Sequence, residues 1–87
     1  MSHLEEMRTF VRIVEAGSIS QAAEQLGIAK SGVSRRLTEL EGRLGVRLIN
    51  RTTRRSSLTE AGRSYYTGAV KLLADVAELD ASTADAE

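Results

Sequence analysis

The chain has 87 residues, with 12 Lys or Arg, 12 Asp or Glu, one His and no Cys, so its formal net charge at pH 7 is zero. This length suffices for one small domain, and the lack of Cys excludes disulfides, cysteine-ligated zinc and thiol catalysis. Because His3 is the single histidine and no apolar stretch reaches membrane-spanning length, we expect a cytoplasmic protein with no enzyme activity, metal site, cofactor or membrane contact.

The charges are unevenly distributed along the chain. Residues 1–29 carry two arginines and four glutamates, a net charge of −2, and residues 64–87 carry one lysine and five acidic residues, a net charge of −4. Residues 30–63 carry nine basic and three acidic residues, a net charge of +6, and eight of the nine are Arg. Arginine binds phosphates and guanine edges through two parallel hydrogen bonds, so this third of the sequence favours a nucleic-acid partner. A solvated basic face is the alternative, and the position of these cations on the fold decides between the two.

Apolar spacing and capping residues predict three short helices in the first half of the chain. The first lies between Ser2 and Gly17, and the second lies between Ser18 and Gly27. The third covers about residues 31–43. The apolar stripe of this third helix, which we expect to be buried, consists of Val33, Leu37, Leu40 and Leu44.

The second half of the chain predicts a β-hairpin and a long helix. Apolar residues within 46–49 indicate a short strand, Ser57 and Leu58 indicate the returning strand, and the polar, basic residues 50–56 would form a wing. A fourth helix should begin after Thr59 and end near residue 80, with 81–87 as a frayed tail or the end of a truncated piece. A monomer would leave the apolar stripe of this helix partly exposed, so we expect it to pair two copies of the chain through Tyr65, Ala69, Leu72, Val76 and Leu79.

These elements define a mainly α winged helix-turn-helix over residues 1–58, with a three-helix core and a two-stranded wing, followed by a linker or dimerisation helix over residues 59–80. In a helix-turn-helix, the second helix of the motif lies in the major groove of DNA. At about 100° per residue, Ser31, Arg35 and Thr38 lie opposite the apolar stripe of the third helix. Short hydroxyl side chains permit a close approach to DNA, and Arg35 can reach guanine O6 and N7. Ordinary solvent-exposed helix surface is the alternative for the hydroxyl residues.

The remaining arginines have less specific roles. Arg36 could contact a phosphate or pair with a neighbouring helix, and Arg43 and Arg47 are expected to be structural or to face phosphates. Arg54 and Arg55 are better candidates for DNA contact, because an extended wing can place arginine in a narrow minor groove.

Several short motifs lie between Phe10 and Gly62: Ala22-Ala23, Val33-Ser34-Arg35, Leu40-Glu41, Leu44-Gly45-Val46-Arg47-Leu48, Asn50-Arg51-Thr52 and Leu58-Thr59-Glu60-Ala61-Gly62. With these motifs, residues 4 to about 80 resemble the N-terminal winged helix-turn-helix of LysR-type transcriptional regulators. The resemblance implies DNA contacts from Lys30, Ser31, Ser34 and Arg35 in the third helix and from Arg54 in the wing. Thr38 and Arg55 are supported only by their positions.

The resemblance also implies how the chain works. It suggests a homodimer that forms through the fourth helix and binds double-stranded operator or promoter DNA sequence-specifically at an inverted repeat. Family members normally carry a larger C-terminal effector-binding domain, which is not among these 87 residues. The chain is therefore expected to be the DNA-binding part of such a regulator.

A different class of function stays open at this point. Winged helices also bind other proteins, so a protein-interaction module without sequence-specific DNA binding is the second hypothesis. A gel-shift assay with genomic fragments separates the two, because a protein-interaction module would not retain DNA even at low salt.

Overall fold

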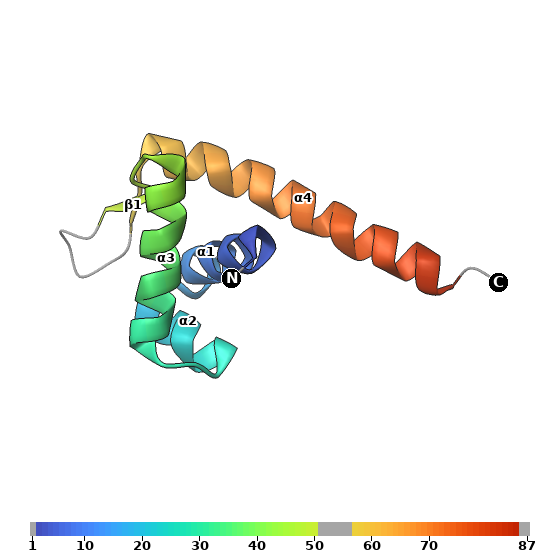
Figure 1. Cartoon of the computed structure of the whole chain (residues 1–87), viewed down its shortest axis with the longest axis horizontal. Coiled ribbons are helices and arrows are strands. Elements are labelled where there is room, and N and C mark those ends of the chain that lie inside the picture. Colours follow the sequence, from blue (N-terminus) through green and yellow to red (C-terminus); the bar gives the residue numbers. More distant parts are fainter. Residues whose placement is uncertain (1, 51–56, 86–87) are drawn as a thin grey trace.

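A computed structural model of the chain describes residues 2–50 and 57–85. It contains a three-helix body, a short antiparallel hairpin beside it, and a long C-terminal helix that extends away from the body (Figure 1). This architecture confirms the predicted winged helix-turn-helix with a long final helix. The elements are α1 (His3–Ala16), α2 (Ile19–Leu26), α3 (Lys30–Leu44), β1 (Ile49–Asn50), β2 (Ser57–Leu58) and α4 (Glu60–Ala84).

Local capping explains where the first helices begin and end. The N–H of Glu5 donates to Ser2 Oγ at 3.1 Å, and the N–H of Gln21 donates to Ser18 Oγ at 3.1 Å, which are the predicted caps of α1 and α2. Gly17 ends α1 in the left-handed conformation, with a φ of 92° that side chains other than glycine rarely adopt. These three helix boundaries therefore follow from the nearby sequence.

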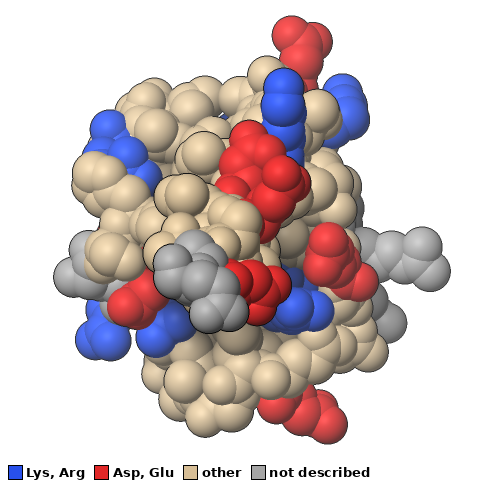
Figure 2. All heavy atoms as spheres, turned by 90° about the vertical axis from the view of Figure 1, so that its right-hand side faces the viewer, with Lys and Arg blue, Asp and Glu red and all other residues tan. Residues whose placement is uncertain are grey.

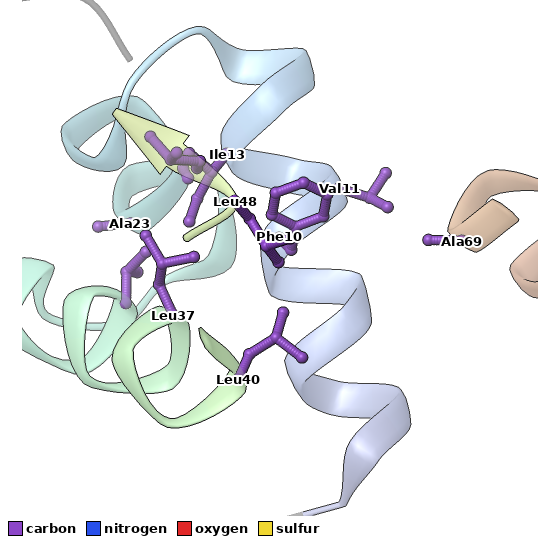
Figure 3. Packing of buried hydrophobic residues seen from close by; sticks show 11 residues of the cluster. Phe10, Val11, Ile13, Ala23, Leu37, Leu40, Leu48 and Ala69 are labelled. Carbon is purple, nitrogen blue, oxygen red and sulfur yellow. The ribbon is translucent and has the colours of Figure 1, made fainter. Parts of the chain in front are cut away.

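The core is aliphatic around one aromatic ring and draws on α1, α2, α3 and the start of the wing, with Ala69 from α4 (Figure 3). Ala22 of α2 is fully buried, and its small side chain lets α2 approach its neighbours closely. Leu44 differs from the prediction, because it is 38% exposed and the buried stripe of α3 continues through Glu41 instead. The fully buried larger side chains are Phe10, Ile13, Val33, Leu37, Leu40, Leu48 and Ile49, together with Thr9.

The hairpin begins later than its sequence predicts. Ile49 pairs with Leu58 and Asn50 pairs with Ser57, which gives two residues on each strand. Val46, which we expected in the first strand, is 42% exposed and lies before it. The preceding N–H of Leu48 donates to a side chain of α3, so the chain is held by α3 before strand pairing starts.

α4 is a single helix of 25 residues that begins after Thr59, whose Oγ1 accepts the N–H of Gly62 at 2.9 Å. The helix continues to Ala84, so residues 81–84 are helical and the tail predicted from residue 81 is wrong for them. No helix in the described part of the chain is long and apolar enough to cross a membrane.

The first half of α4 packs on the body, mainly on α1. Tyr65 lies edge-on to Phe10, with ring centroids 5.4 Å apart, and Ala69 is only 3% exposed. Both residues thus pack against the body of the same chain, although we expected them at a dimer interface. The predicted dimer stripe is reduced to Leu72, which is 45% exposed, Val76, which is half-buried, and Leu79, which is 64% exposed.

Candidate nucleic-acid interface

The candidate interface is the solvent-facing side of α3. Ser31, Arg35 and Thr38 are exposed along it, and Lys30 is the first, exposed residue of the helix. Ser34 is half-buried on the flank. The structure therefore brings all five predicted contact residues of α3 to one side of the body, where a groove of DNA could be approached. A surface depression at the N-terminal end of this side is lined by Ile28, Ala29, Ser31, Gly32, Arg35 and Arg36.

Arg36 belongs to the scaffold of this surface. Its Nη1 donates to Thr9 Oγ1 of α1 at 3.2 Å, and the Thr9 hydroxyl in turn donates to the carbonyl of Glu5 at 2.8 Å. This arrangement favours the structural role that the sequence left open for Arg36, because the guanidinium ties α3 to α1.

Arg43 forms a second link between the same two helices. Its Nη2 and Nε donate to Glu6 Oε1 at 3.0 and 3.2 Å, and Glu6 is only 7% exposed. A carboxylate in this position needs a cation, since an unpaired buried charge is strongly destabilising. Arg36 precedes the buried residue Leu40 in the sequence, and Arg43 follows it. Their hydrogen bonds to Thr9 and Glu6 therefore fix the orientation of α3 relative to α1 at two points.

Glu41 is a functional candidate that the sequence analysis did not single out. Its Oε2 accepts the N–H of Leu48 at 2.7 Å and the N–H of Ile49 at 3.2 Å, and the residue is 8% exposed. The motif Leu40-Glu41 was a possible signal, but a glutamate beside an apolar stripe does not reveal which backbone amides it will meet.

The predicted wing contacts Arg54 and Arg55 lie outside the described residues. The structure describes the base of the wing, where β1 and β2 pair beside α3 and α4. DNA contact by Arg54 and Arg55 stays a prediction.

Three acidic residues in the second half of α4 are exposed to solvent. Asp75, Glu78 and Asp80 lie on the half of α4 that extends beyond the body. Figure 2, which shows the side of the molecule with the C-terminal end of α4, shows Asp and Glu interspersed with Lys and Arg there. The predicted contact residues of α3 include the cations Lys30 and Arg35, and the exposed acidic residue Glu39 lies on the same helix.

Comparison with known proteins identifies the family. The sequence pattern of the bacterial regulatory helix-turn-helix proteins of the lysR family matches residues 4–63. The chain belongs to this family. An HTH-type transcriptional repressor of Pseudomonas aeruginosa is 49% identical over 82 residues, which are 94% of this chain and 26% of that protein. The HTH-type transcriptional regulator CrgA of Neisseria meningitidis is 53% identical over 73 residues, which are 84% of this chain and 24% of CrgA.

Solved structures of lysR-family proteins have the same fold. The DNA-binding domain of BenM, in its complex with catB site 1 DNA, superposes with a TM-score of 0.93 at 35% identity, with 99% of each chain covered. The structure of CrgA superposes with a TM-score of 0.79 at 47% identity, with 95% of this chain and 28% of that chain covered. The chain spans about a quarter of the length of the curated relatives that it matches.

Proposed function

We propose that this chain binds double-stranded DNA sequence-specifically, as the DNA-binding domain of a lysR-family transcriptional regulator, and that it acts in the cytoplasm by binding and not by catalysis. The observation that carries the proposal is its likeness, over 99% of both chains, to a domain whose structure contains DNA. The exposed side of α3 supports it, because hydroxyl groups and cations converge there on a helix that α1 holds firmly in place.

In the proposed complex, α3 lies in the major groove. Arg35 then contacts guanine O6 and N7, while Lys30, Ser31, Ser34 and Thr38 contact phosphates or neighbouring base edges. Arg54 and Arg55 of the wing reach the flanking minor groove.

Two copies of the chain are proposed to pair through the exposed part of the α4 stripe. Leu72, Val76 and Leu79 supply apolar surface that the body of the same chain does not cover. Two-fold symmetry then presents two α3 helices to an inverted repeat, with half-sites separated by about one helical turn of DNA, roughly 34 Å.

Selection of bound duplexes from a random-sequence library tests the proposal. We expect an inverted repeat to be enriched, and we expect its affinity to fall steeply with salt because contacts to phosphates release counterions. A library that yields no enriched sequence at low salt would overturn the proposal and would favour the protein-interaction module.

A further inference from the structure

The short segment that leads into β1 is held from two sides, and one side is α3. The side chain of Glu41 on α3 accepts two hydrogen bonds from this segment, from the N–H groups of Leu48 and Ile49 at 2.7 and 3.2 Å. Hydrogen bonds to an ionised acceptor are stronger than those between neutral groups, and Glu41 is 8% exposed. Within the part of the chain that the structure describes, two peptide N–H groups at the start of the wing therefore bond to one carboxylate oxygen of α3.

The other side of this segment is the beginning of α4. The N–H of Thr59 donates to the carbonyl of Leu48 at 3.0 Å, and its hydroxyl donates to the carbonyl of Arg47 at 2.7 Å. Gly62 is buried in the first turn of α4, and a Cβ at this position would overlap the carbonyl oxygen of Leu48. The peptide groups of residues 47–49 consequently connect α3 to the first turn of α4.

We propose that Glu41 is a positioning residue for DNA recognition, which sets the orientation of α4 relative to α3 through Leu48 and so sets the spacing of the half-sites. This inference rests on the proposed function, in which α3 contacts DNA and α4 joins two copies. Glu41 itself does not touch DNA, because its carboxylate faces the backbone of the wing.

The length of α4 makes this orientation matter. A helix of 25 residues is about 37 Å long. A tilt of about 5° at its first turn therefore moves its far end by about 3 Å, which is close to the rise of one base pair, about 3.4 Å. Small changes at residues 47–49 are thus large enough to change which spacing of half-sites the dimer fits.

Two substitutions at Glu41 distinguish the effect of its hydrogen bonds from the effect of its charge. Glu41→Met removes the acceptor at similar volume, whereas Glu41→Gln retains an amide oxygen that can accept the same N–H groups. The probes are the inverted repeat selected by the unmodified chain and two duplexes with a spacer longer or shorter by one base pair. We expect the unmodified chain and Glu41→Gln to discriminate the selected spacing by about tenfold or more, and Glu41→Met to discriminate by about threefold or less.

A second readout does not involve DNA. Amide hydrogen exchange at Leu48 and Ile49 should be faster in Glu41→Met than in the unmodified chain, and Glu41→Gln should exchange nearly as slowly as the unmodified chain. A helical, folded Glu41→Met chain with unchanged spacing discrimination would overturn the inference and leave the proposed function intact. A library without any enriched duplex would overturn the proposed function and this inference with it.

If Glu41→Met does not fold, Thr59→Val tests the same connection from the α4 side. It removes the hydroxyl that bonds the carbonyl of Arg47 and caps α4, and Thr59→Ser keeps it as a matched control. We expect Thr59→Val to weaken the preference for one spacing and Thr59→Ser to retain it. Equal preferences in a folded Thr59→Val chain would overturn the inference.

Discussion

Arg43 of α3 donates two hydrogen bonds to the same oxygen of Glu6 on α1, at 3.0 and 3.2 Å. The side chain of Glu6 is 8% exposed and that of Arg43 is 33% exposed, so the carboxylate is buried and the cation reaches solvent. The pair holds the proposed recognition helix on the helix that packs behind it.

Removal of Arg43 should destabilise the fold. Arg43→Ala leaves the Glu6 carboxylate buried without its cation, so we expect a loss of about 2–3 kcal/mol in the free energy of unfolding, measured by urea denaturation. Arg12→Ala is the control, because it breaks the exposed Arg12–Glu15 pair at 3.8 Å. That control should cost less than about 1 kcal/mol. Similar losses in the two variants would contradict the structural role of the Glu6–Arg43 pair.

Arg35 should determine sequence preference. Arg35→Ala removes the proposed contacts to guanine, so affinity for the selected duplex should fall by about 1–3 kcal/mol and discrimination against random duplex should decrease. Competition gel shifts measure both quantities. Arg8→Ala removes an exposed arginine from α1 and should leave the discrimination unchanged. If Arg35→Ala keeps its helicity and its full discrimination, the assignment of Arg35 is wrong.

The exposed stripe of α4 should control association. The double variant Leu72→Glu and Val76→Glu places like charges on this stripe, so it should be monomeric in sedimentation experiments and bind DNA more weakly. At about 100° per residue, Ala74 and Ala81 lie on the opposite side of α4, and both are exposed. Ala74→Glu with Ala81→Glu therefore adds the same charge and should remain dimeric. An unmodified chain that is monomeric at high concentration would contradict the prediction.

Two glycines of α4 should respond oppositely to the same substitution. Gly62→Ala forces a Cβ against the carbonyl of Leu48, so we expect a loss of about 1–3 kcal/mol in the free energy of unfolding. Gly68 is exposed and has open space at its Cβ position. Gly68→Ala should therefore stabilise the helix by about 0.5–1 kcal/mol. Thermal denaturation of the two variants tests whether the first turn of α4 lies against the carbonyl of Leu48. Equal effects of the two substitutions on stability would contradict this contact.

Ionisation of Tyr66 should lower the stability of the fold at high pH. Burial raises the pKa of the Tyr66 hydroxyl above its ordinary value of 10.0, and the charge of Glu15 and the hydrogen bond that Tyr66 donates to it at 3.2 Å raise it further. Because the pKa is higher in the folded than in the unfolded chain, neutral Tyr66 contributes to the stability of the fold below pH 10. This contribution is lost as the pH rises through the pKa of the folded chain. Absorbance titration of tyrosinate should show that Glu15→Gln shifts the Tyr66 pKa back toward 10.0. An unchanged titration curve would show that the contact with Glu15 does not form.

The agreement between sequence and structure is best where the determining interactions are local. Ser2 and Ser18 cap the helices that follow them, because a capping hydroxyl reaches an N–H only three residues away. The exposed position of Arg35 also follows from helical periodicity alone, since it lies opposite Val33 and Leu37. The contacts of Arg54 could not be compared, because this residue lies outside the described part of the chain.

The differences arise where one element meets another. Periodicity placed Leu44 in the buried stripe, but the chain turns after α3 and the buried position goes to Glu41, which binds the start of the wing. It also placed Tyr65 on a dimer surface, although the ring packs on Phe10 of the same chain.

The sequence by itself determined the order of the helices, the caps at the start of α1, α2 and α4, and the exposed side of α3, because each depends on residues within a few positions of one another. Only the tertiary structure decided that Arg36 and Arg43 bind α1, that Glu41 binds Leu48 and Ile49, and that Gly62 lies against Leu48. These contacts join residues as far as 37 positions apart in the sequence. An amphipathic pattern specifies which side of a helix is buried, but the partner of each buried group depends on how the helices pack together.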